Sequence, residues 1–126
     1  MDAHETVENV RVDGLCGRVY ASARDPSAPV FVLLHGIGMS HRYFAPIYRA
    51  LAGIGATYSF DLPGFGPTPK PSDAVSIPSY ARFVEQVIHR HGISSCILVG
   101  HSMGTQLAIE LSVRRPSLGA DDLGFS

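Results

Sequence analysis

Strand-like segments alternate with helical patterns along this chain, and this alternation restricts the possible folds more than any other feature. Residues 30–34 and 96–99 are continuous apolar runs, and residues 56–60 form a third strand-like segment. Such runs are typical of strands buried on both faces of a parallel sheet. The segments between them carry helical periodicity. The sequence therefore predicts an α/β fold, with a mostly parallel sheet and helices on both faces.

The predicted helices differ in how much apolar surface they carry. The first spans residues 41–52, the second begins near Pro78 and ends at Gly92, and the third spans residues 103–115. Before the first helix and the strand-like run at 30–34, two short strand-like segments at residues 10–12 and 18–21 predict an N-terminal hairpin. The third helix has apolar residues on two sides, so we expect broad burial. The apolar residues are Phe44, Ile47, Tyr48 and Leu51 in the first helix, and Leu107, Ala108, Leu111, Ile109 and Val113 in the third.

A G-x-S-x-G pattern, Gly100-His101-Ser102-Met103-Gly104, lies between a predicted buried strand and a predicted helix. In this context the serine is held on a sharp strand-to-helix turn, where its hydroxyl can attack an acyl carbon. The glycines suit strained backbone and a close approach between strand and helix. The pattern therefore predicts a nucleophilic serine.

Two further segments follow predicted strands in the same way. His35-Gly36 comes directly after the run 30–34, and Asp61-Leu62 follows the segment 56–60. Sites in open α/β sheets lie beyond the carboxyl ends of the strands. We therefore expect both segments to lie near Ser102.

Together these elements resemble the α/β-hydrolase superfamily, over roughly residues 10–116. The resemblance implies that Ser102 is a nucleophile and that the Met103 N–H is one oxyanion donor. The second donor would be the N–H of Ile37, with Gly38 as an alternative. It also implies a small-molecule acyl substrate and no cofactor, and a serine argues against the dehalogenase and epoxide-hydrolase branches, which use aspartate there. The matching segments are His35-Gly36-Ile37-Gly38, Asp61-Leu62-Pro63-Gly64-Phe65-Gly66 and Gly100-His101-Ser102-Met103-Gly104.

The remaining histidines and Asp61 have simpler interpretations than catalysis. We expect His101 to pack in its turn rather than act as a base, since the side chains of adjacent residues such as His101 and Ser102 point apart. We expect His35 to shape its loop. His41 opens the first helix and could line the site, although a surface position is the simpler expectation. Asp61 is predicted to organise its own glycine-rich turn.

The sequence departs from the family pattern after Ser102. The family places its acid and its histidine later in the chain, yet no histidine follows Ser102, and the carboxylates there are Glu110, Asp121 and Asp122. We therefore expect residues 1–126 to be one truncated domain, with a core at residues 10–116 and an irregular tail at residues 117–126. It would contain only the first five strands of the fold and the helix that follows the nucleophile elbow, the turn at Ser102. The primary hypothesis is a serine hydrolase of carboxylic esters whose triad acid and base are absent from this chain. The alternative is a non-catalytic fragment or interaction module, which could pair with itself or with a complementary fragment through an exposed sheet edge.

Composition excludes several other classes. The 126 residues are 45% hydrophobic and 17% charged, with a net charge of −1 and no basic block, which argues against nucleic acid as a partner. The longest apolar stretch is too short to span a membrane, and residues 1–10 lack signal-peptide features, so we expect a cytoplasmic protein. Cys16 and Cys96 lack metal-site spacing, and no metal is predicted.

Overall fold

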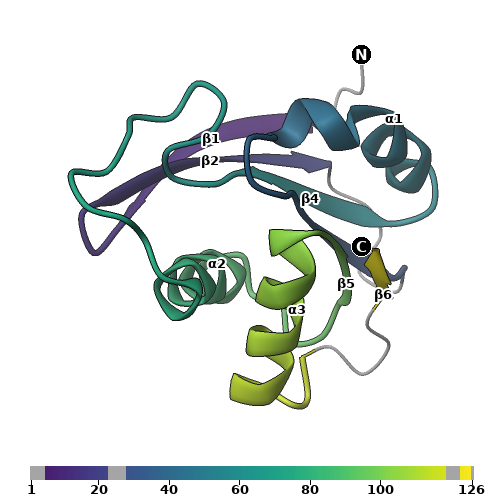
Figure 1. Ribbon diagram of the computed structural model, residues 1–126. Helices are drawn as coiled ribbons and strands as arrows, with labels where there is room; N and C mark the ends of the chain where they lie inside the picture. The colour runs from purple at the N-terminus through teal and green to yellow at the C-terminus, as the bar shows by residue number, and fades with distance from the viewer. Residues whose placement is uncertain (1–4, 23–27, 119–122, 126) are drawn as a thin grey trace.

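The computed structural model describes residues 5–22, 28–118 and 123–125. In this part of the chain one sheet of six strands has the order β1-β2-β4-β3-β5-β6 (Figure 1). Strand β2 pairs antiparallel with both β1 and β4, whereas β3 runs parallel to β4 and β5, and β5 runs parallel to β6. The strands are β1 Glu5–Val12, β2 Leu15–Ser22, β3 Val30–Leu34, β4 Ala56–Asp61, β5 Ile97–His101 and β6 Leu123–Phe125, and the helices are α1 His41–Ala52, α2 Ile77–Arg90 and α3 Met103–Arg114.

The N-terminal hairpin is confirmed, with longer strands and a tighter turn than predicted. Val12 pairs with Leu15 across a two-residue turn. Both turn residues, Asp13 and Gly14, have positive φ angles, of 51° and 81°. Two positive φ angles are the requirement of a type I′ turn, whose twist matches that of the flanking strands. The Asp-Gly pair therefore fixes the register of β1 against β2.

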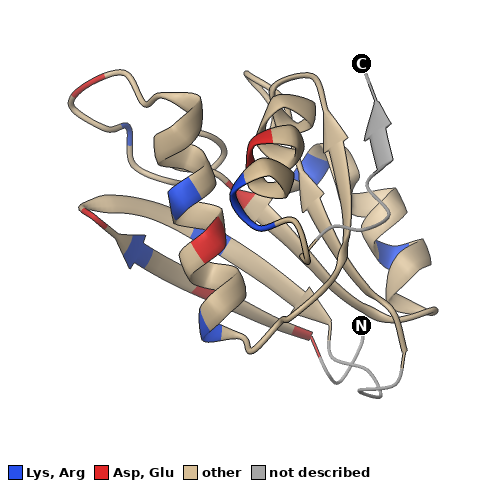
Figure 2. Ribbon diagram, turned by 90° about the horizontal axis from the view of Figure 1, so that it is seen from below, with Lys and Arg blue, Asp and Glu red and all other residues tan. Residues whose placement is uncertain are grey.

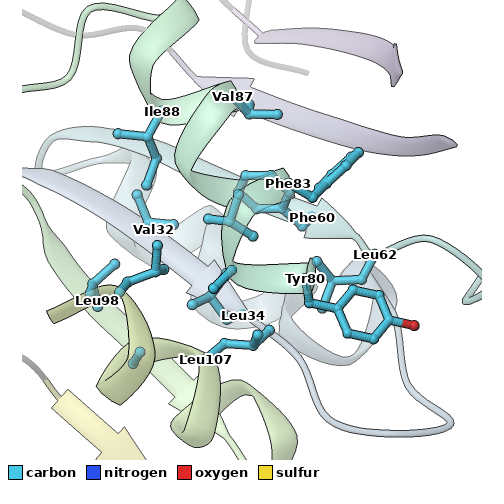
Figure 3. Close-up of a cluster of buried hydrophobic side chains, with 14 of the residues drawn as sticks. Val32, Leu34, Phe60, Leu62, Tyr80, Phe83, Val87, Ile88, Leu98 and Leu107 are labelled. Atoms are coloured by element: carbon cyan, nitrogen blue, oxygen red, sulfur yellow. The ribbon is translucent and has the colours of Figure 1, made fainter. Parts of the chain in front are cut away.

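Helices cover both faces of the sheet, as predicted. In Figure 1, α1 lies on one side of the sheet and α2 and α3 lie on the other. Alternate residues of β3 point to opposite faces: Leu33 packs in a cluster with Phe44 and Tyr48 of α1, whereas Val32 and Leu34 belong to the larger cluster on the α2 and α3 side. Figure 3 shows this larger cluster, in which α2 contributes Phe83, Val87 and Ile88, α3 contributes Leu107, and the strands contribute Val32, Leu34, Phe60 and Leu98.

The burial of α3 is narrower than its sequence predicts. Leu107, Ala108 and Leu111 are buried against the sheet and α2, but Ile109 is 61% exposed and Val113 is 73% exposed. The expectation of broad burial is therefore wrong on this face. Periodicity shows that a helix has an apolar side, but it does not show how many neighbours are present to cover it.

The segment 117–126, expected to be irregular, contains a short strand. Leu118 is buried, and its carbonyl accepts a hydrogen bond of 2.6 Å from the Cys96 N–H. Residues 123–125 then form β6, which pairs in parallel with β5. The expected edge at β5 is therefore covered along these three residues. Strand pairing satisfies main-chain groups whatever the side chains are, which explains why the sequence pattern did not reveal β6.

Charged residues are spread along the hairpin, the helices and the loops of the described chain (Figure 2). Glu85 of α2 connects the two neighbouring helices, because it pairs with Arg114 at 2.9 Å and Arg115 at 3.5 Å. Both cysteines are free thiols. Within residues 5–22, 28–118 and 123–125, no helix is long and apolar enough to cross a bilayer.

Candidate active site

Ser102 occupies a strained backbone position between the end of β5 and the start of α3. Its φ and ψ angles are 56° and −117°, and its side chain is exposed. A positive φ in a residue with a Cβ costs on the order of 1–3 kcal/mol and persists only where the surrounding structure enforces it. The turn thus holds the hydroxyl outside the sheet, at the amino end of a helix.

Two glycines make this turn possible. A Cβ on Gly104 would overlap the carbonyl oxygen of Leu34 in β3 and lie 2.6 Å from its carbonyl carbon. A Cβ on Gly100 would overlap the Gly104 carbonyl and lie 2.7 Å from the Thr105 nitrogen. The obstacles are main-chain atoms, which cannot rotate away. The G-x-S-x-G pattern is therefore required by the close packing of the first turn of α3 on β3 and β5.

The loop between β3 and α1, residues 35–40, lies directly against Ser102. A Cβ on Gly36 would be 3.0 Å from the Ser102 Cβ and 3.1 Å from the His101 carbonyl oxygen. The loop turns back where the Met39 N–H donates to the Gly36 carbonyl at 3.1 Å, and Gly38 has a φ of 75°. The structure therefore brings the His-Gly segment and the serine together, as the sequence predicts.

The amino end of α3 and the β3–α1 loop both offer main-chain donors near Ser102. Met103 is the first residue of α3, and the first N–H groups of a helix have no partner within it. Ile37 is 71% exposed and follows Gly36, which contacts Ser102. The assignment of Ile37, or of Gly38, as an oxyanion donor stays a prediction.

His35 is a buried structural residue, as expected. Its Nδ1 lies 2.8 Å from the Gly36 carbonyl oxygen, and its Nε2 lies 3.0 Å from the Leu62 nitrogen. A carbonyl only accepts and an N–H only donates, so Nδ1 carries the proton and Nε2 accepts. Burial lowers the pKa of His35, against the opposing effects of the Gly36 carbonyl and Asp61. Because both ring nitrogens are engaged, His35 cannot act as a general base.

Asp61 and His41 are neighbours, but they do not form an acid–base pair. The carboxylate Oδ1 accepts a hydrogen bond of 2.8 Å from the main-chain N–H of His41, not from its ring. The ring instead bonds Ser59 through Nδ1 at 2.7 Å and stacks on Tyr20 with a centroid separation of 3.7 Å. Burial lowers the pKa of His41, and Asp61 opposes this shift. Asp61 therefore does not orient the His41 imidazole for proton transfer.

Thr68 organises the glycine-rich turn that follows β4. Its Oγ1 lies within 3.0 Å of the nitrogens of Gly64 and Phe65 and of the carbonyl oxygens of Leu62 and Phe65. The carboxylate of Asp61 accepts instead from Tyr20 and from the main chain of His41, and its expected role in this turn stays a prediction. Sequence reasoning missed Thr68, although hydroxyl side chains often bond the main chain within turns.

His101 packs in the turn at Ser102. Its half-buried ring lies against Tyr43 of α1, with ring centroids 4.8 Å apart. Among the described residues no group of three His, Cys, Asp or Glu side chains is arranged to hold a metal ion.

Comparison with known proteins agrees with this geometry. The family model described as the alpha/beta hydrolase fold matches residues 29–118. The chain belongs to the α/β-hydrolase family. A haloalkane dehalogenase from Bradyrhizobium diazoefficiens is 32% identical over 97 residues, and an sn-1-specific diacylglycerol lipase, ABHD11, from Xenopus tropicalis is 35% identical over 92 residues. The crystal structure of a haloalkane dehalogenase loop variant, DbeA-M1 from Bradyrhizobium elkanii, superimposes with a TM-score of 0.84 at 29% identity.

This α/β-hydrolase chain spans less than half of each of these proteins. The alignments cover 77% of the chain but 31% of the dehalogenase, and 71% of the chain but 28% of the lipase. The superposition covers 97% of the chain and 40% of the solved structure. The described residues thus correspond to one part of the fold, the part that carries the turn at Ser102 and the β3–α1 loop.

Proposed function

We propose that this chain provides the nucleophile and the oxyanion donors of a serine hydrolase that cleaves carboxylic esters through an acyl-enzyme on Ser102. The observation that carries the proposal is the strained, exposed position of Ser102 against Gly36. The hydroxyl would attack the ester carbonyl, and the N–H groups of Met103 and Ile37 would stabilise the negative charge that develops on the carbonyl oxygen. Loss of one such donor typically lowers the rate by about 10²–10³-fold.

The identity of the nucleophile favours an ester over an alkyl halide. A carboxylate that displaces halide forms an ester, which water can then hydrolyse. A serine hydroxyl would instead form an ether, which water does not cleave under the same conditions. With Ser102 in the turn between β5 and α3, the acyl-enzyme route is productive and halide displacement is not. The substrate class is therefore proposed to follow the lipase relative rather than the dehalogenase relative.

A serine hydroxyl requires a general base, usually a histidine held by a carboxylate. Both ring nitrogens of His35 are engaged, and the His41 ring bonds Ser59 rather than Asp61. No histidine follows Ser102 in the sequence. The proposal therefore takes the base and the acid from residues outside this sequence. A non-catalytic interaction module with the same fold is the alternative, and the engaged histidines favour it over a self-sufficient enzyme.

A fluorophosphonate, followed by intact mass measurement, tests the proposal on the whole chain. Added imidazole supplies a free base in place of the one the chain does not hold. We expect one label per chain, formed faster with imidazole, and lost in Ser102→Ala. Ser95→Ala, which removes another exposed serine hydroxyl, should label like the wild type.

The outcomes separate the two hypotheses. Labelling that survives Ser102→Ala would contradict the assignment of the nucleophile. No labelling of a folded chain, even with imidazole, would favour the non-catalytic module.

A further inference from the structure

The β3–α1 loop is attached to the end of β4 at both of its ends. At the first end, the Leu62 N–H donates to His35 Nε2 at 3.0 Å. At the second end, the His41 N–H donates to the Asp61 carboxylate at 2.8 Å. The two anchoring residues, Asp61 and Leu62, are consecutive in the chain and fully buried. The loop is therefore held as a bridge, with Ile37 near its middle.

The Asp61 carboxylate is itself fixed from two sides. The Tyr20 hydroxyl of β2 donates to Oδ2 at 2.6 Å. Burial, followed by the bond to Asp61, raises the pKa of Tyr20, so this hydroxyl remains a donor. Gly66, with a φ of 58°, packs so closely that a Cβ there would lie 2.9 Å from Asp61 Oδ1 and 3.0 Å from the Ser40 Cβ. The carboxylate can thus hold the start of α1 in one place.

We propose that Asp61 is a positioning residue that, through the His41 N–H, holds the β3–α1 loop against Ser102 and thereby sets the place of the Ile37 donor. The inference rests on the proposed function for its catalytic meaning, but its structural content does not depend on catalysis. The carboxylate has an electrostatic advantage here, because a negative charge at the amino end of α1 interacts favourably with the helix dipole. Tyr20 supports Asp61 in this role through its hydrogen bond, although β4 and β3 separate its strand from β5, which leads to Ser102.

Amide hydrogen exchange of the ¹⁵N-labelled full chain tests the proposal without requiring activity. The reporter is the Met39 N–H, whose bond to the Gly36 carbonyl closes the loop. In Asp61→Ala we expect exchange at Met39 and His41 to rise at least tenfold, with no change at Val32 in the core. Asp61→Asn, which keeps an acceptor oxygen, should restore most of the protection. Asp73→Ala removes an exposed carboxylate and serves as the control.

The same variants have a chemical readout. If the wild type reacts with fluorophosphonate, Asp61→Ala should slow labelling of Ser102 at least tenfold, and Asp61→Asn should recover it. If the wild type does not react, the proposed function fails and exchange alone decides the positioning role.

Faster exchange at His41 with wild-type exchange at Met39 would overturn the proposal, because Asp61 would then only cap α1. Should Asp61→Ala not fold, Tyr20→Phe decides the question. It removes the donor to Asp61 but keeps the ring that stacks on His41, and exchange at Met39 should rise about threefold or more. Wild-type exchange at Met39 in Tyr20→Phe would refute the arrangement.

Discussion

Three glycine-to-alanine substitutions separate the two reasons for which this fold needs glycine. Gly53 has an ordinary φ of −76°, and an added Cβ would meet only the Ala50 carbonyl oxygen at 3.4 Å. Gly92 has a φ of 69°, but open space surrounds its Cβ position. Gly104 has an ordinary helical backbone, but its Cβ would overlap the main chain of Leu34. Gly53 is therefore subject to neither constraint, Gly92 to backbone strain alone, and Gly104 to steric collision alone.

The expected changes in the free energy of unfolding follow from these differences. Gly53→Ala should stabilise the protein by about 0.4–1 kcal/mol, because alanine reduces the entropy of the unfolded chain. Gly92→Ala should destabilise it by roughly 1 kcal/mol, the cost of a left-handed conformation with a Cβ. Gly104→Ala should destabilise it by about 3 kcal/mol, the upper end of the usual range for overpacking, because Leu34 is buried main chain that cannot rotate aside.

Urea denaturation followed by circular dichroism measures all three variants. About 3 kcal/mol is a large share of the 5–15 kcal/mol that stabilises a typical domain, so Gly104→Ala should unfold at a clearly lower urea concentration. The slope of the transition should stay constant, since none of the three substitutions changes appreciably how much surface is exposed on unfolding. A Gly104→Ala variant no less stable than Gly92→Ala would refute the argument that main-chain contact fixes the turn at Ser102.

Two further predictions use the same stability assay. Ser102→Gly should be more stable than Ser102→Ala by about 1 kcal/mol, because glycine adopts a positive φ without strain. Both substitutions remove the hydroxyl, so equal stabilities would mean that the turn holds no strain. The pKa of His35 is lowered in the folded state, so the unfolded state binds protons more readily and stability should fall as the pH drops below about 6.5. His35→Gln should remove part of this slope.

Local patterns in the sequence predicted the parts of the fold that depend on local chemistry. The run of five apolar residues at β3 is buried on both faces, and the Asp13-Gly14 pair forms the hairpin turn. The G-x-S-x-G pattern predicted the turn at Ser102. A side chain at either glycine would collide with main-chain atoms, of the turn itself or of the adjacent strand. The strand and the hairpin turn could be predicted because their causes lie close together in the chain. The turn at Ser102 could be predicted because its glycine spacing is a known pattern, although Gly104 packs against Leu34 of a strand that is distant in the chain.

The features that sequence reasoning missed depend on distant partners. Asp61 bonds Tyr20 and the main chain of His41, and nothing local to Asp61 indicates either contact. The exposure of Ile109 depends on which elements pack beside α3, not on the helix itself. Strand β6 arises from main-chain pairing with β5, which leaves little trace in side-chain pattern.

The strand order has a consequence for how the chain folds during synthesis. In the finished sheet β4 lies between β2 and β3, yet it is the last of the three to leave the ribosome. Thr57 follows its partner Ser22 by 35 residues, so the hairpin waits roughly 2–7 s for β4 at ordinary elongation rates. A hairpin itself forms in about 1–10 μs. During that interval β2 and β3 have no strand between them, and any persistent pairing of the two would exclude β4 and the Asp61 carboxylate that it carries.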